Sequence, residues 1–326
     1  MRLYLCGRSA LSVLRYLRSI HDERLFRRPS RIRSLTQAVR LRSQLTSLSF
    51  EAEYLVGHAG DTVHALVPSQ ELHGSRDGFT AHLWSASVPS GAFLRLADDL
   101  FVSSPAFVFL HMARELEPFE LAMLGLELCG FYSLPECRVP FVSKSIDETE
   151  YEIPAVTTAR RIRALCDAAP AAHGVERARM VSRWLADCSA SPMESIVFLL
   201  LTLSRHWGGY AVPAPVFNPK VVVKTARGVE SRYPDLYWHD ASIDVEYQSD
   251  FAHTGAWKRY KDSKRHIQLT VNKITVLPLT KIQVEDASDF HEFALGLRKL
   301  LRMRNRRFDR SWEVRRDELR RSLLAF

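Results

Sequence analysis

A short run of alternating apolar and polar residues, residues 243–248, carries the side chains best suited to chemistry in this sequence. Successive residues of a β-strand point to opposite faces of its sheet. The apolar positions of this run therefore share one face, and the other face holds Asp244, Glu246 and Gln248. Carboxylate and amide oxygens about 7 Å apart on one stiff strand suit the binding of a hard metal ion.

The preceding segment, residues 233–238, is expected to be the partner strand of a hairpin. With a four-residue loop, Trp238 pairs with Ile243. Directly opposed residues face the same way, so this register places Asp235 beside Glu246. A three-residue loop would mix apolar and polar faces, and the pattern argues against it. Two opposed carboxylates repel each other unless they share a divalent cation or face open solvent.

Pro234-Asp235, followed a short interval later by Glu246-Tyr247-Gln248, resembles the signature of PD-(D/E)XK nucleases. Gln248 stands where that signature usually has a lysine. Upstream, residues 191–195 open an apolar segment that resembles the leading helix of the superfamily, with Glu194 as its glutamate.

The residues after the hairpin resemble the branch related to very-short-patch repair endonucleases. In that branch the hairpin is followed by a histidine, a helix with an Asp-x-x-Arg motif and a last core strand. His253, then Asp262 and Arg265, and then residues 275–280 match this order. The resemblance implies a restriction-endonuclease-like α/β core in the C-terminal part of the chain.

The resemblance also implies a function, metal-dependent hydrolysis of DNA phosphodiester bonds, with Mg²⁺ or Mn²⁺ as cofactor. Asp235 and Glu246 would hold the metal, and Glu194 would support it. Gln248 would position the attacking water, and His253 would assist by proton transfer or a phosphate contact. The setting implied is bacterial defence, or a system like a toxin and its antitoxin, in the cytoplasm.

Each candidate residue also has a plainer explanation. Glu194 is the N3 residue of a capping box opened by Ser191, and His253 is typical of a surface position. Glutamine is neither a base nor a cation. Gln248 therefore leaves open a non-catalytic nucleic-acid-binding regulator, or an antitoxin-like protein, built on a degenerate nuclease fold. A protein-interaction scaffold with an incidental acidic hairpin is a third alternative.

A basic helix is expected directly after the hairpin, and it has two interpretations. It is either an ordinary solvated face or a face that contacts phosphates of a nucleic acid. Asp262 could simply pair with Arg265, three residues on. The candidate nucleic-acid-binding residues are Lys258, Lys261, Lys264 and Arg265.

Length and charge limit the class of protein. With 326 residues, 46% of them hydrophobic, the chain can bury a sizeable core and form two domains. Its net charge of +8 favours an anionic partner, and nucleic acid, above all DNA, fits best. No run approaches the roughly 18 apolar residues of a membrane span. The five cysteines are widely spaced, which predicts reduced thiols in a cytoplasmic protein.

The sequence divides into four parts. Residues 1–150 are expected to form a mixed α/β domain that could bind a protein partner, and residues 151–188 a helical connector. The nuclease-like domain covers residues 189–304, and residues 305–326 form a basic, solvated extension in which many arginines alternate with acids. Residues 102–132 loosely resemble the N-terminal region of abortive-infection type IV antitoxin-like bacterial proteins.

Hydrophobic periodicity predicts the elements of these parts. In the first part we expect helices at 11–20 and 32–48 and strands at 53–56, 63–67, 80–84 and 100–103. A helix pair follows at 106–116 and 118–129, with Ser104 as N-cap and Pro105 at the first helical position. Further helices are expected at 158–167, 175–187 and 288–303. The arginines near the N-terminus are expected on a solvated or nucleic-acid-contacting helix face.

Overall fold

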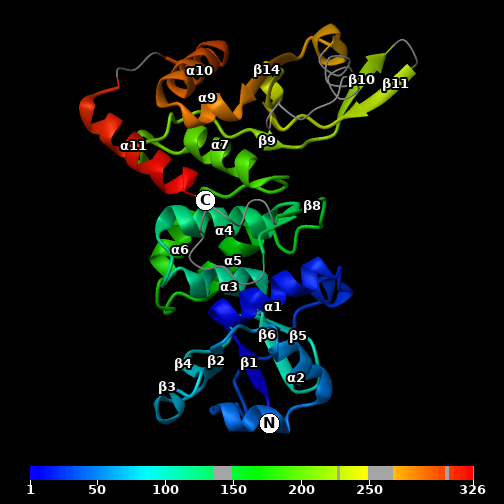
Figure 1. Ribbon diagram of the computed structural model, residues 1–326, viewed down its shortest axis with the longest axis vertical. Helices are drawn as coiled ribbons and strands as arrows, with labels where there is room; N and C mark the ends of the chain where they lie inside the picture. The colour runs from blue at the N-terminus through cyan, green and yellow to red at the C-terminus, as the bar shows by residue number, and fades with distance from the viewer. Residues whose placement is uncertain (136–148, 226–227, 249–266, 305–307, 326) are drawn as a thin grey trace. The chain divides into compact units, whose positions relative to one another are not determined.

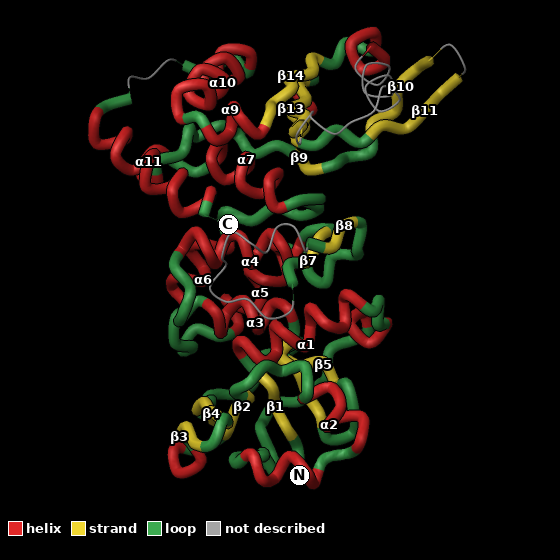
Figure 2. The backbone as a smooth tube through the Cα atoms, in the orientation of Figure 1, coloured by secondary structure: helices red, strands yellow, loops and turns green. Residues whose placement is uncertain are grey.

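The computed structural model describes residues 1–135, 149–225, 228–248, 267–304 and 308–325 (Figures 1 and 2). Helices and mixed sheets alternate along the chain, which makes the fold α/β. The chain divides into two compact units, an N-terminal unit, Met1–Leu185, and a C-terminal unit, Ala186–Ala325. In the ranges described, no helix has both the length and the apolar character needed to cross a membrane.

A six-stranded mixed sheet forms one layer of the N-terminal unit. The strand order is β3-β4-β2-β1-β6-β5. Strand β1 is parallel to β6 and antiparallel to β2, while β2 is parallel to β4. The strands are β1 (Leu3–Leu5), β2 (Val63–Val67), β3 (Gly74–Arg76), β4 (Phe79–Leu83), β5 (Phe93–Arg95) and β6 (Leu100–Ser103). A separate small pair joins β7 (Tyr132–Ser133) to β8 (Glu150–Tyr151).

Helices α1 and α3 pack on this sheet, and three further helices pack against them and against one another. Helix α1 contacts α3, α3 contacts α5, and α4 contacts α6. The predicted start of α3 is confirmed, because Ser104 Oγ accepts a hydrogen bond from the Phe107 N–H and Pro105 is the first residue. The helices are α1 (Gly7–Ser19), α3 (Pro105–Met112), α4 (Pro118–Cys129), α5 (Ala159–Ala168) and α6 (Val175–Ser182). The expected connector thus contributes α5 and α6 to the N-terminal unit.

Two predictions for the N-terminal unit are wrong. The strand expected at residues 53–56 lies in helix α2 (Phe50–Val56), where Ser49 caps the first turn and acidic residues follow it. The helix expected at residues 32–48 contains only a 3₁₀ segment, Arg42–Ser47. Its first half instead pairs with the start of β1, through backbone hydrogen bonds that join Arg2 to Gln37 and Val39.

Two N-terminal arginines expected at the surface are buried. Arg15 makes two hydrogen bonds to the Glu127 carboxylate, of 2.9 and 2.6 Å. Arg18 donates to the backbone carbonyls of Glu127, Gly130 and Pro154. Both lie on the face of α1 that packs into the unit, because the helical period carries them to the same side as its leucines.

The C-terminal unit is built on a four-stranded mixed sheet with the order β14-β13-β12-β9. Strands β12 and β13 are antiparallel, and β13 and β14 are parallel. The strands are β9 (Val216–Phe217), β12 (Leu236–Trp238), β13 (Ile243–Gln248) and β14 (Thr275–Thr280); β10 (Val221–Thr225) and β11 (Gly228–Arg232) form a separate hairpin. The helices are α7 (Pro192–Thr202), α9 (Lys281–Glu285), α10 (Ala287–Leu300) and α11 (Arg310–Leu324).

The C-terminal segment is not the solvated extension that its charges predict. Helix α11 packs on α7 and buries Trp312, Leu319 and Leu323, whose spacing places them on one face. The Trp312 indole donates to the Gly209 carbonyl at 3.0 Å. Arg320 is also buried and donates to the carbonyl of Glu285 at 2.9 Å. Part of the basic charge of this segment therefore holds the fold together.

Candidate functional site

The hairpin β12–β13 has the register that the sequence predicts. Trp238 pairs with Ile243, and Leu236 pairs with Val245. A four-residue loop connects them and ends at Ser242, whose φ of 51° lies in the left-handed region. Leu236, Trp238, Ile243 and Val245 are buried, and the alternation sets Glu246 and Gln248 on the opposite face.

Asp235 lies directly before β12, next to the position of Glu246 in the neighbouring strand. Its Oδ2 atom accepts a hydrogen bond from the backbone N–H of Tyr247 at 2.9 Å. Its own carbonyl accepts from the N–H of Asn218 at 3.1 Å. These two bonds hold the Asp235 carboxylate against the C-terminal half of β13.

Glu194 is in the first turn of α7 and is 7% exposed. Ser191 caps this helix as predicted, because its Oγ accepts from the Glu194 N–H at 3.1 Å. The return bond of the expected capping box is shifted by one residue: Glu194 Oε2 accepts from the Ala190 N–H at 2.9 Å. The Glu194 carboxylate therefore stabilises the start of α7 and is itself buried in the C-terminal unit.

Asn218, which sequence reasoning missed, connects the two acidic residues. Its Nδ2 donates to Glu194 Oε2 at 2.9 Å, while its backbone N–H bonds the carbonyl of Asp235. The residue has a φ of 46°, a conformation that asparagine tolerates better than most residues. An asparagine after a short apolar strand was the available signal, but its partners are distant in sequence.

The pKa of Glu194 reflects its burial, its hydrogen bonds and the charge of Glu246. Burial raises the pKa of the Glu194 carboxyl, and hydrogen bonds from Ala190, Asn218 and Ser191 oppose this shift. The negative charge of Glu246 raises the pKa of Glu194 further. The charge of Glu246 therefore disfavours ionisation of Glu194, and a bound cation would oppose this effect.

Only the second half of the polar face of β13 is accessible. Asp244 is fully buried, and its neighbours on the adjacent strands are Tyr237 and Val276. Both neighbours belong to or pack on an apolar cluster that also contains Leu269. Glu246 and Gln248 are half-buried. Of the three polar residues of β13, only Glu246 and Gln248, at the C-terminal end of the strand, remain candidates for the site.

The structure links Glu194 to Asp235 through Asn218 and bonds the Asp235 carboxylate to the residue after Glu246. Gln248 lies on the same face of β13 as Glu246. The other five candidates lie outside the described residues: His253, Lys258, Lys261, Lys264 and Arg265. Among the residues that are described, no group of three or more histidine, cysteine or acidic side chains could ligate one metal ion.

The C-terminal unit thus presents an acidic site at the end of a central strand in an α/β fold. No family model matches the chain, and neither a curated protein nor a solved structure does.

The raised pKa of Glu194 predicts the effect of a neutral substitute. A folded-state pKa above the unfolded value of about 4.3 means that the carboxyl stabilises the fold when protonated. That stability is lost as the pH rises through the folded pKa. Glu194→Gln keeps the shape and an acceptor for Ala190 and Asn218, so we expect its Tm at pH 7 to equal or exceed that of the wild type.

Thermal unfolding of the full chain at neutral and acidic pH measures this effect. The advantage of Glu194→Gln should shrink as the pH falls, because the wild-type carboxyl then becomes neutral as well. The control is Glu292→Gln, which changes an exposed glutamate on α10. A Glu194→Gln protein less stable than this control at pH 7 would contradict the prediction.

Proposed function

We propose that the C-terminal unit is a metal-dependent nuclease that hydrolyses DNA phosphodiester bonds. The observation that carries the proposal is geometric: Asn218 links the Glu194 carboxylate to the backbone of Asp235, and the Asp235 carboxylate accepts from the N–H of Tyr247, the residue after Glu246. Carboxylates gathered in this way cost free energy unless a cation compensates them. The order of Glu194, Asp235 and Glu246 along the chain is the order of the acidic residues in the PD-(D/E)XK pattern that the sequence resembles.

The acidic oxygens suit Mg²⁺ or Mn²⁺, which are hard cations. Mg²⁺ is usually held by one or two carboxylates, together with water and substrate phosphates. Asp235 and Glu246 would supply these two carboxylates, and a site of this kind needs no third protein ligand. When bound, the metal would acidify a water molecule and neutralise charge on the phosphate.

The protein's own groups have distinct roles in this proposal. Glu194, held by Asn218 at 2.9 Å, adds negative charge behind Glu246 and so strengthens its attraction for a cation. Gln248 would orient the attacking water by a hydrogen bond, since its amide can both donate and accept. His253 and the basic residues at 258–265 would contact the DNA backbone. The implied setting is bacterial defence in the cytoplasm.

A non-catalytic DNA-binding regulator is the second candidate, and one observation favours it. Gln248 has no charge, so the residue that usually completes this type of site is replaced by one that cannot stabilise developing negative charge. Such a protein would use the same fold and bind DNA without cleaving it.

Calorimetric titration of the full-length protein with MgCl₂ tests the metal site. We expect saturable binding to the wild type and none to Glu246→Gln. Asp240→Asn is the matched control, because Asp240 lies in the loop of the same hairpin and is exposed. Equal binding by the wild type and Glu246→Gln would remove the metal site from the proposal.

A further inference from the structure

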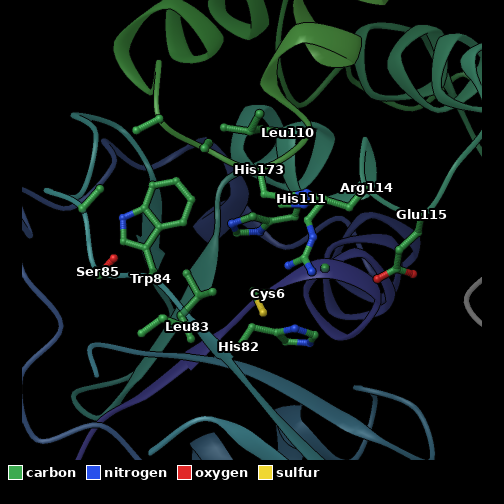
Figure 3. A pocket seen from close by; sticks show the side chains of 15 residues that line it. Cys6, His82, Leu83, Trp84, Ser85, Leu110, His111, Arg114, Glu115 and His173 are labelled. Atoms are coloured by element: carbon green, nitrogen blue, oxygen red, sulfur yellow. The ribbon is translucent and has the colours of Figure 1, made fainter. Parts of the chain in front are cut away.

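The N-terminal unit contains a cavity that none of the chemistry above uses. It lies where the end of β1 meets β4 and the end of α3, and its volume is about 180 Å³ (Figure 3). A cavity of about 150 Å³ is large enough to hold benzene. The cavity can therefore take a small organic molecule.

The walls of the cavity combine an apolar body with histidine side chains. Leu83, Leu110 and the indole of Trp84 supply apolar surface. Both ring nitrogens of His111 are shielded from solvent, and neither has a hydrogen-bond partner within the described ranges. Buried polar atoms are almost always hydrogen-bonded in folded proteins, so an unpartnered imidazole at a cavity points to a ligand.

Two of the three histidines that line the cavity, His82 and His111, are neutral at physiological pH. Burial lowers the pKa of His82 to about 4, and the neighbouring His64 and Arg114 add to the shift. Burial also lowers the pKa of His111 to about 3. His82 bonds the ring of His64 at 2.9 Å. Each neutral ring offers one donor and one acceptor, so neither adds positive charge.

Arg114 places a positive charge at the cavity. Figure 3 shows its side chain reaching toward the rings of His111 and His82. Glu115 also lines the cavity, but its carboxylate is paired with Arg8 at 2.6 Å. No acidic side chain in the described part of the chain forms an ion pair with Arg114. The guanidinium is therefore available to an anionic ligand.

The start of α1 adds backbone donors on the same side. Gly7, the first residue of this helix, lines the cavity. No side chain caps the helix and its first turn has no acidic residue. Gly7 has a φ of 50°, and a Cβ built on it would meet no atom within 4 Å. Backbone N–H groups at a helix start attract anions.

We propose that this cavity binds a small organic phosphate. The phosphate is bound by Arg114 and the start of α1, and the body of the molecule lies against Trp84 and Leu83. Donors that approach from the guanidinium, the backbone and an imidazole match the three terminal oxygens of a phosphate better than the two of a carboxylate. Burial raises the pKa of the nearby Cys6 thiol, which favours its protonated form at neutral pH.

The test uses phenyl phosphate as the probe, titrated into the full-length protein by calorimetry. We expect binding, with an affinity that falls about tenfold or more in Arg114→Gln, because a charge-assisted hydrogen bond is lost. Arg114→Lys should retain part of the affinity. Arg160→Gln, an exposed arginine at the start of α5, should bind as the wild type does.

Two related probes define the chemical class. Phenol, which lacks the phosphate, and benzoate, which replaces it with a carboxylate, should both bind more weakly than phenyl phosphate. Equal binding of phenol, tighter binding of benzoate, or unchanged affinity in Arg114→Gln would each overturn the proposal. The cavity lies wholly in the N-terminal unit, so these results do not depend on the outcome of the metal titration.

Discussion

The Glu246→Gln protein is expected to lose Mg²⁺-dependent cleavage of DNA, with a rate reduced on the order of a thousandfold. The substitution keeps the size of the side chain but removes a charge and a metal-ligand oxygen. Because Asp235 would then be the only carboxylate on the metal, the cation is lost at ordinary concentrations. The measurement is cleavage of single- and double-stranded DNA with Mg²⁺ and with Mn²⁺.

Substitutions of Gln248 distinguish the proposed nuclease from the non-catalytic DNA-binding regulator. If the amide only orients water, Gln248→Ala should keep a measurable rate, lower by about tenfold, which corresponds to one hydrogen bond. Gln248→Lys should raise the cleavage rate, since it introduces the lysine that the PD-(D/E)XK signature usually has at this position. Asp240→Asn, in the hairpin loop, controls for charge removal. A wild-type protein that cleaves no faster than Glu246→Gln on any substrate leaves the non-catalytic regulator as the function.

The hairpin of the site could be predicted from sequence because two local constraints agree. Strict alternation over residues 243–248 decides which side chains share a face, and only a four-residue loop keeps the apolar faces together. The register of Trp238 with Ile243 follows, as observed. Asn218 could not be found in this way. Its bonds reach Glu194 and Asp235, and no periodicity encodes a contact between such distant residues.

The arginines of α1 and α11 were predicted to lie at the surface, and several are buried for the same reason. An arginine side chain can lie in solvent or be buried, depending on its hydrogen-bond and ion-pair partners. The sequence does not reveal those partners. In α11 the density of charge hides the apolar face of Trp312 and Leu323. In α1 the buried Arg15 finds its acidic partner, Glu127, on another helix. Local composition does not predict whether the charged side chains of a helix point to solvent or into the fold.

The ion pair of Arg15 and Glu127 should dominate the stability of the N-terminal unit. Glu127 is fully buried, and Arg15 is 3% exposed. Glu127 Oε1 also accepts from the N–H of Leu134 at 3.2 Å. Removing one partner of a buried pair leaves an uncompensated charge and costs about 3–5 kcal/mol. We therefore expect Glu127→Ala to destabilise this unit by that amount.

Hydrogen exchange measured by mass spectrometry on the full chain resolves the effect by segment. Peptides covering α1 and α4 should exchange roughly two to three orders of magnitude faster in Glu127→Ala, since each 1.4 kcal/mol is about tenfold. Peptides of the C-terminal sheet should change little, because they belong to a separate compact unit.

Two further variants show whether the buried charge is the cause. Glu176→Ala breaks an exposed pair with Arg179, in which the Glu176 side chain is 83% exposed, and such pairs contribute about 0–1 kcal/mol. The double variant Arg15→Met with Glu127→Leu removes both charges together and should recover part of the loss, because no unpaired ion remains. If Glu127→Ala accelerates exchange no more than Glu176→Ala does, the ion pair is not what stabilises α1 against α4.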